Sequence, residues 1–171
     1  MWNEQIIMML LEGIKDTLYM TLTSTLIGYV IGLPMGILLT VTDKDGIHPN
    51  AAVYKVLDVI ANLIRSVPFL ILLIVLIPFT RFLIGRSYGP TATIVPLVIA
   101  AAPYIARMVE SSLKEVDAGV IEAARSMGAS NFTIVTKVML VEARTSLIVG
   151  ATISLGTILG YSAMAGTVGG G

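Results

Sequence analysis

The sequence has 171 residues, of which 56% are hydrophobic and only 13% are charged, about half the charged share that is usual in soluble domains. This composition excludes an ordinary soluble domain and predicts one membrane-embedded domain over residues 1–171. The formal net charge is zero and cysteine is absent, so nothing indicates nucleic acid as a partner, and disulfide and thiol chemistry are excluded.

Residues 1–16 are predicted to lie at the membrane surface, where Trp2 suits the boundary between lipid and water. They do not resemble a cleavable signal peptide, because the chain begins with an acidic residue, Glu4, and its first apolar run is short. The first membrane span follows over about residues 17–42 without a charged residue. That length exceeds the roughly 20 apolar residues that a helix needs to cross the hydrocarbon layer.

Glycines recur at four-residue spacing on this span, at Gly28, Gly32 and Gly36. They share one helix face, and a face without side chains lets another helix backbone approach closely. The alternative is that glycine is simply frequent in membrane helices.

The second span is predicted over about residues 56–80, with Pro68 expected to bend it. Its uninterrupted apolar part covers only about 20 Å, so Arg65 is expected inside the helix near one boundary, on a face that Asp58 can share. Two interpretations of Arg65 remain open. Its guanidinium can reach the lipid headgroups, or it can face the interior of the subunit as a functional group.

A polar segment over residues 114–143 separates the third span, about 92–108, from the fourth, about 145–165. Because it lies between two apolar spans, it is expected at a membrane surface. Asp117 can cap one helix, Gly128 can end that helix in the left-handed conformation, and Ser130 can cap the next. The segment therefore predicts a helix–glycine–helix elbow. The fourth span is again rich in small residues, and Gly156 and Gly160 are predicted to form a second close-packing pair.

The elbow also carries a sequence pattern: Glu122-Ala123-Ala124 is followed by Gly128 and, ten residues later, by Val138 and Leu140. This pattern resembles the cytoplasmic coupling loop of ABC importer permeases, except that Val141 stands where the family has proline. A simpler interpretation is an amphipathic surface helix without a docking role. The resemblance implies that the surface coupling to an ATPase subunit includes Glu122, Ala123, Ala124, Arg125 and Gly128.

A narrower resemblance, to amino-acid importer permeases and most closely to those for methionine, lies in the tracts 64–69 and 160–169. It implies an all-α membrane bundle that works as a homodimer with two cytoplasmic ATP-binding subunits and an external substrate-binding protein. It also implies import of methionine, with both D- and L-forms possible. Such permeases usually have five spans, and this sequence ends in a glycine run after four, so we expect a chain truncated at its C-terminus.

No residues form a pattern for catalysis or for nucleotide binding. No glycine-rich loop precedes a Lys-Ser or Lys-Thr pair, so ATP and Mg²⁺ are expected to bind a partner chain, and this chain is not expected to be an enzyme. The single histidine, His48, lies in a polar connection with no cysteine in the chain, so no metal site is expected. A transporter without its own energy source needs a docked ATPase.

The hypothesis for the substrate path is Tyr161, Ser162 and Met164. They place a phenol, a hydroxyl and a polarisable thioether on a span of otherwise small and aliphatic residues, and a thioether adapts well to a methionine side chain. The alternative is that Met164 fills a packing gap and Tyr161 is an interfacial anchor. Competing functions are import of another amino acid or small solute, an ion-coupled secondary transporter fragment, and a membrane scaffold.

Lysine and arginine counts predict the orientation, because cytoplasmic loops are enriched in these residues. With the elbow in the cytoplasm, seven basic residues lie on that side and three on the other, with Arg65 unassigned. We therefore expect a multi-pass protein of the bacterial inner membrane with its N-terminus outside. The cytoplasmic set is Lys44, Lys55, Arg107, Lys114, Arg125, Lys137 and Arg144.

Overall fold

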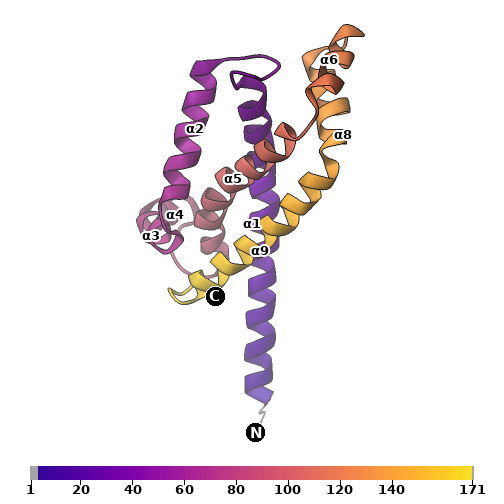
Figure 1. The fold of residues 1–171 in the computed structure, drawn as a ribbon. Coiled ribbons are helices and arrows are strands. Elements are labelled where there is room, and N and C mark those ends of the chain that lie inside the picture. The colour runs from indigo at the N-terminus through magenta and orange to yellow at the C-terminus, as the bar shows by residue number, and fades with distance from the viewer. Residues whose placement is uncertain (1–3, 171) are drawn as a thin grey trace.

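The computed structural model describes residues 4–170, which form helices and connecting turns without a strand, so the predicted all-α class is confirmed. α5 (Pro90–Lys114) is the central helix and contacts α1 (Glu4–Thr42), α2 (Ala51–Ser66) and α9 (Arg144–Gly166) (Figure 1). Over the described range, three helices are long and apolar enough to cross a membrane, and a fourth span results if α2 and the helix after it count as one.

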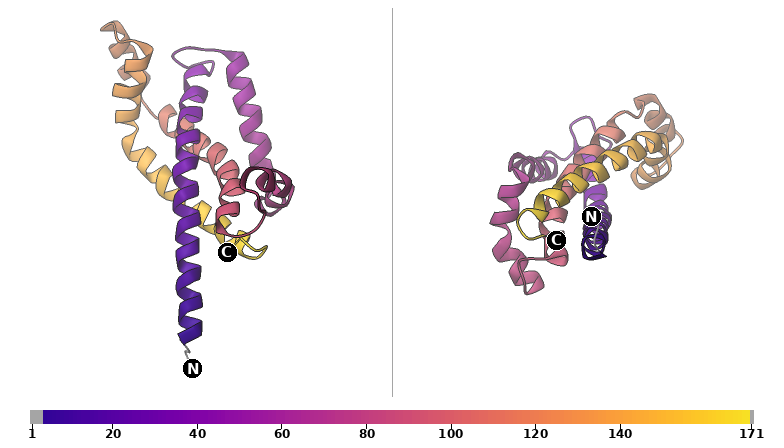
Figure 2. Two further views of the ribbon diagram at one scale, coloured as in Figure 1. Left: turned by 180° about the vertical axis from the view of Figure 1, so that it is seen from behind. Right: turned by 90° about the horizontal axis from the view of Figure 1, so that it is seen from below.

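α1 is much longer than a membrane is thick. Its 39 residues extend about 58 Å at the helical rise, against roughly 30 Å of hydrocarbon. Its N-terminal part projects beyond the other helices (Figure 2) and carries Glu12, Lys15 and Asp16. The helix therefore starts before residue 17, where the apolar span was expected to begin. Trp2, expected at the membrane boundary, lies outside the described residues.

α1 packs against α5 along its glycine stripe. A Cβ atom added to Gly32 would lie 2.6 Å from the carbonyl oxygen of Ala102, and one added to Gly36 would lie 2.5 Å from that of Ala106. At Gly28 the nearest atoms belong to side chains, at 3.0 and 3.1 Å. Only glycine lets two backbones approach this closely, so the close packing predicted for this stripe is confirmed.

The second predicted glycine pair behaves differently. A Cβ atom added to Gly156 or Gly160 would have no neighbour within 4 Å among the residues described, so the prediction of a close-packing pair is wrong within this chain. The buried stripe of α9 instead includes Gly150, Ser154 and Ile158, at four-residue spacing. Gly156 and Gly160 lie two positions away from residues of this stripe, so they point to the opposite side of the helix.

The segment expected as the second span is broken. α2 ends at Ser66, and after a bend of 102° the chain continues as α3 (Phe69–Val75) and α4 (Ile77–Ile84). Val67 has the extended conformation, with ψ at 124°, which a residue before proline favours. The bend expected at Pro68 is confirmed, and it turns the chain back beside the lower end of α5 (Figure 1).

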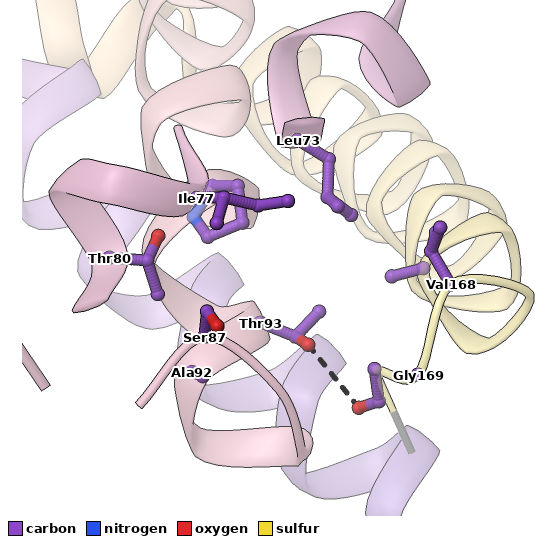
Figure 3. A pocket seen from close by; sticks show the side chains of 11 residues that line it. Leu73, Ile77, Thr80, Ser87, Ala92, Thr93, Val168 and Gly169 are labelled. Carbon is purple, nitrogen blue, oxygen red and sulfur yellow. Dashed lines mark hydrogen bonds between the residues drawn. The ribbon is translucent and has the colours of Figure 1, made fainter. Parts of the chain in front are cut away.

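The segment after α9 closes onto the start of α5. The backbone N–H of Gly89 donates to the carbonyl of Gly169 at 2.9 Å, and Thr93 Oγ1 donates to the carbonyl of Gly170 at 3.3 Å. Figure 3 shows the small hollow that Thr93 and Gly169 line together with Leu73 and Ile77. Its volume of about 20 Å³ is close to the minimum for one water molecule, so it is too small for a solute.

Candidate functional site

The polar segment between α5 and α9 forms the predicted elbow. α6 (Ala118–Ser126) begins at Asp117, whose Oδ1 accepts a hydrogen bond from the backbone N–H of Gly119 at 2.7 Å. Gly128 has a φ of +81°, the left-handed conformation that ends helices. Ser130 Oγ then accepts from the N–H of Thr133 at 3.2 Å and caps the next helix. All three local predictions are confirmed.

After Ser130 the chain forms three short helical pieces before the long helix α9. They are α7 (Asn131–Thr133), the π-helix η1 (Ile134–Met139) and α8 (Leu140–Glu142). Ile134 and Met139 are buried and hold the elbow together. Val141, which replaces the proline of the resembled pattern, lies within α8, and the helical path turns only at Ala143.

The five residues predicted to couple to a partner lie together on α6 and at its end. Glu122, Ala123, Arg125 and Gly128 are exposed, whereas Ala124 is buried. The carboxylate of Glu122 could act as a helix cap or contact a partner chain. Asp117 provides the cap, and Glu122 makes no hydrogen bond or ion pair within residues 4–170.

Two large apolar side chains at the tip of the elbow were missed from the sequence. Met127 is 83% exposed and Phe132 is 78% exposed, on either side of Gly128. Large exposed apolar side chains that lie together mark a contact with a partner protein or with a membrane. The available signal was their position next to the helix-ending glycine.

The elbow is attached to the bundle through the turn that follows α1. Arg125 Nη2 donates a hydrogen bond to the backbone carbonyl of Ile47 at 2.9 Å. In the same turn, the carboxylate of Asp43 pairs with Lys114 Nζ at 2.7 Å, at the end of α5. This contact lowers the pKa of Asp43 below its usual value, chiefly through the hydrogen bond from Lys114. α6 therefore contacts the turn after α1 directly through Arg125. That turn is itself linked to the end of α5 by the ion pair between Asp43 and Lys114.

A cluster of charged side chains joins α2 to α5 on the same side of the molecule. Arg107 pairs with Asp58 of α2 and, at 2.7 Å, with Glu110 of its own helix. Glu110 is buried and also accepts from Lys114 at 2.8 Å. Asp58 was expected to share a helix face with Arg65, but its partner is Arg107. The cluster was not predicted, because it depends on how α2 and α5 approach one another.

The three residues of the hypothetical substrate path point in different directions. Ser162 is buried against α1, where its hydroxyl and that of Thr21 lie 3.3 Å apart. Tyr161 stacks on Phe69, with ring centroids 4.7 Å apart. Met164 is 46% exposed on the surface of the chain. Only Tyr161 lines a cavity that is large enough for part of a solute.

No group of three or more histidine, cysteine, aspartate or glutamate side chains within residues 4–170 has the arrangement of a metal site. The arrangement described above offers an exposed elbow, a charged cluster behind it and a cavity deeper in the bundle. These features suit mechanical coupling and solute passage more than bond-making chemistry.

Comparison with known proteins gives close matches along nearly the whole chain. Residues 7–171 match the family described as "Binding-protein-dependent transport system inner membrane component". The D-methionine transport system permease protein MetI of Salmonella typhimurium is 51% identical over 164 residues, which are 96% of this chain and 76% of that protein. The MetI protein of Escherichia coli K12 has the same identity and coverage.

The fold has an equally close counterpart among solved structures. The MetNI methionine ABC transporter, in inward-facing conformations, contains a chain that superposes with a TM-score of 0.96 at 50% sequence identity. The match covers 99% of this chain and 79% of the other. An amino acid ABC transporter crystallised with histidines gives a TM-score of 0.64 at 23% identity and shares the fold.

Proposed function

The chain belongs to the family of binding-protein-dependent transport system inner membrane components, and from this premise we propose that it is the permease subunit of an ABC importer for methionine. The observation that carries the proposal is the TM-score of 0.96 at 50% identity with the MetNI methionine ABC transporter. Two copies of the permease form the path through the membrane. The substrate is D- or L-methionine, delivered by an external binding protein.

The energy for import comes from a partner. ATP and Mg²⁺ bind to two cytoplasmic ATPase subunits, and the elbow docks in a groove on each of them. The exposed tip, with Met127 and Phe132 beside Gly128, supports this role. Burial of such apolar side chains against a partner lowers the free energy of the complex. Glu122, which has no partner within the described residues, pairs with a basic side chain of the ATPase.

Closure of the ATPase dimer moves the elbow, and the spans then rock between inward-open and outward-open states. The bond from Arg125 to Ile47 and the pair between Asp43 and Lys114 support transmission to α1 and α5 together. Because these contacts place the elbow and the turn after α1 on the same side, they agree with the basic-residue count that puts both in the cytoplasm and the N-terminus outside.

Transport by purified components tests the proposal. We expect proteoliposomes that contain the permease and the ATPase subunit to accumulate labelled methionine only with internal ATP and external binding protein. Omission of the ATPase subunit is the control, and it should abolish uptake. Uptake driven by an ion gradient without the ATPase would instead identify a secondary transporter. Stronger competition by another amino acid than by unlabelled methionine would overturn the choice of substrate.

A further inference from the structure

A cavity of about 180 Å³ lies where the bend between α2 and α3 meets α5 and α9. For comparison, an apolar cavity of about 150 Å³ can admit a molecule such as benzene, so this cavity can hold the backbone end of an amino acid. Three polar side chains line it: Arg65, Tyr104 and Tyr161. The rest of the wall is mainly apolar and includes Phe69, Leu72 and Ala100.

Arg65 is exposed in the single chain and lines this cavity near the C-terminal end of α2. From Ala51, at the start of α2, to Arg65 the helix extends about 21 Å at the usual rise per residue. The start of α2 follows directly from the turn that holds the elbow, so Arg65 lies at the opposite end of α2 from the elbow. A cationic side chain in a candidate membrane span is costly unless an anion or water accompanies it.

Three acidic side chains of α2, α5 and the turn after α1 are already engaged with other cations. Asp58 and Glu110 pair with Arg107, and Glu110 and Asp43 pair with Lys114. Arg65 itself makes no ion pair and donates no hydrogen bond to the residues described at positions 4–170. The cavity therefore contains a guanidinium that has no anionic partner among the described residues. A guanidinium binds a carboxylate well, because it can donate two parallel hydrogen bonds to it.

Tyr104 and Tyr161, the two tyrosines that line the cavity, are each held in place by a neighbouring side chain. The Tyr161 ring stacks on Phe69 with an angle of 9° between the ring planes. The hydroxyl of Tyr104 lies 3.3 Å from that of Thr157 on α9. A phenol can donate one hydrogen bond to an anion, so both hydroxyls can supplement the guanidinium. The apolar residues then face the remainder of the solute.

We propose that this cavity binds the α-carboxylate of the amino acid during its passage, with Arg65 as the anion contact. The proposal rests on the importer function proposed above and names the part of the substrate that is recognised within the membrane. Under this proposal Arg65, which is exposed in the single chain, faces the solute path, and this corresponds to the second of the two interpretations left open by the sequence.

Cysteine protection tests this site directly, because the chain has no native cysteine. Val67 lines the cavity and is half-buried, so Val67→Cys in the assembled transporter reports occupancy through its alkylation rate. We expect methionine to slow alkylation. Methionine amide, which lacks the carboxylate, should need about 10- to 100-fold higher concentration, the factor that charge-assisted hydrogen bonds supply.

Arg65 variants identify the contact. In the Val67→Cys background, Arg65→Gln should raise the protecting concentration of methionine by the same factor and leave that of methionine amide unchanged. Arg65→Lys, which keeps the charge but loses the planar fork, should give an intermediate value. Ala151→Cys, in a separate hollow between α1 and α9, is the matched control and should show no protection.

Several outcomes would overturn the site. Equal protection by methionine and its amide in the protein with native Arg65 would do so even if Arg65→Gln failed to assemble. The assay can be repeated in nanodiscs with and without phosphatidylglycerol. An alkylation rate that changes with this lipid and not with methionine would assign the anion to a lipid. Normal methionine uptake by Arg65→Gln without protection would remove this site and leave the importer intact, whereas no methionine uptake by the unaltered complex would remove the importer.

Discussion

α1 and α9 carry the same kind of glycine pattern, but the two helices use it differently. On α1, Gly32 and Gly36 lie so close to the backbone of α5 that a methyl group has no room. On α9, Gly156 and Gly160 have open space around them in the described chain. The spacing of glycines therefore predicts a smooth face, and the structure decides whether a neighbour occupies it.

The difference follows from the direction in which each helix approaches α5. α1 runs along α5 with its glycine stripe turned inward, whereas α9 meets the bundle through the stripe that contains Gly150 and Ser154. The open face of α9 lies on the other side. Glycine substitutions on the two helices can therefore distinguish the loss of close packing within the subunit from the effect that replacing glycine has on the helix alone.

The largest effect is expected on α1. Gly32→Ala and Gly36→Ala should each destabilise the bundle by about 2–3 kcal/mol, because overpacking against a backbone cannot be relieved by a rotamer change. Gly28→Ala should cost less, about 1 kcal/mol, since its neighbours are side chains that can shift. Thermal unfolding in detergent measures the series. Gly13→Ala is the control, because its added Cβ meets nothing within 4 Å, and an equal loss there would contradict the explanation.

A glycine that is needed for its conformation rather than for space should have an intermediate effect. Gly128 has open space around its Cβ position but a φ of +81°, and a β-branched residue in that conformation costs about 1–2 kcal/mol. Gly128→Val should therefore loosen the elbow and reduce co-purification of the ATPase subunit, while the spans remain folded. Gly13→Val, on α1 away from the elbow, where an added Cβ meets nothing within 4 Å and φ is not positive, is a comparison variant. Unchanged co-purification of Gly128→Val would contradict this elbow geometry.

A smaller effect is expected where α1 ends, at the pair between Asp43 and Lys114. Because Lys114 is 43% exposed, Asp43→Asn should cost only about 0.5–1 kcal/mol. The folded-state pKa of Asp43 is lowered from 3.8, so its contribution is present above that pH and is lost as the pH falls through the lower folded value. Stability curves of the two proteins should differ at neutral pH and converge in acid. A difference that grows in acid would have the wrong sign.

The smallest effect should come from the open face of α9. Gly156→Ala should not destabilise the isolated subunit, because no atom is displaced and alanine favours the helix. The same substitution measured in the assembled transporter sharpens the comparison. A loss that occurs only in the assembly would show that a second chain covers this face.

The sequence predicted what depends on neighbouring residues. The Asp117 cap, the left-handed Gly128 and the Ser130 cap each need only a few residues of chain, and the bend at Pro68 follows from the geometry of the residue before proline. The composition indicated a membrane-embedded domain, and the resemblance to importer permeases implied the all-α class. These features were therefore accessible without knowledge of how the helices pack.

The sequence did not predict contacts that depend on distant helices. The partner of Asp58 is Arg107, 49 positions away, rather than its neighbour on the same helix. The orientation of α9 decided that Ser162 meets Thr21 while Met164 is exposed. Short-range patterns contain no information on such angles between helices, so these side chains could be named from the sequence but not assembled into one site.

The hydrogen bond from Arg125 reaches the main chain of Ile47 rather than its side chain. Every amino acid presents a carbonyl oxygen, so this bond places no demand on the side chain at position 47, which separately packs against the hydrophobic core. For the bond itself, the constraint falls on the course of the backbone and on the arginine. A shortened or lengthened turn after α1 would therefore harm the connection more than a change of residue within it.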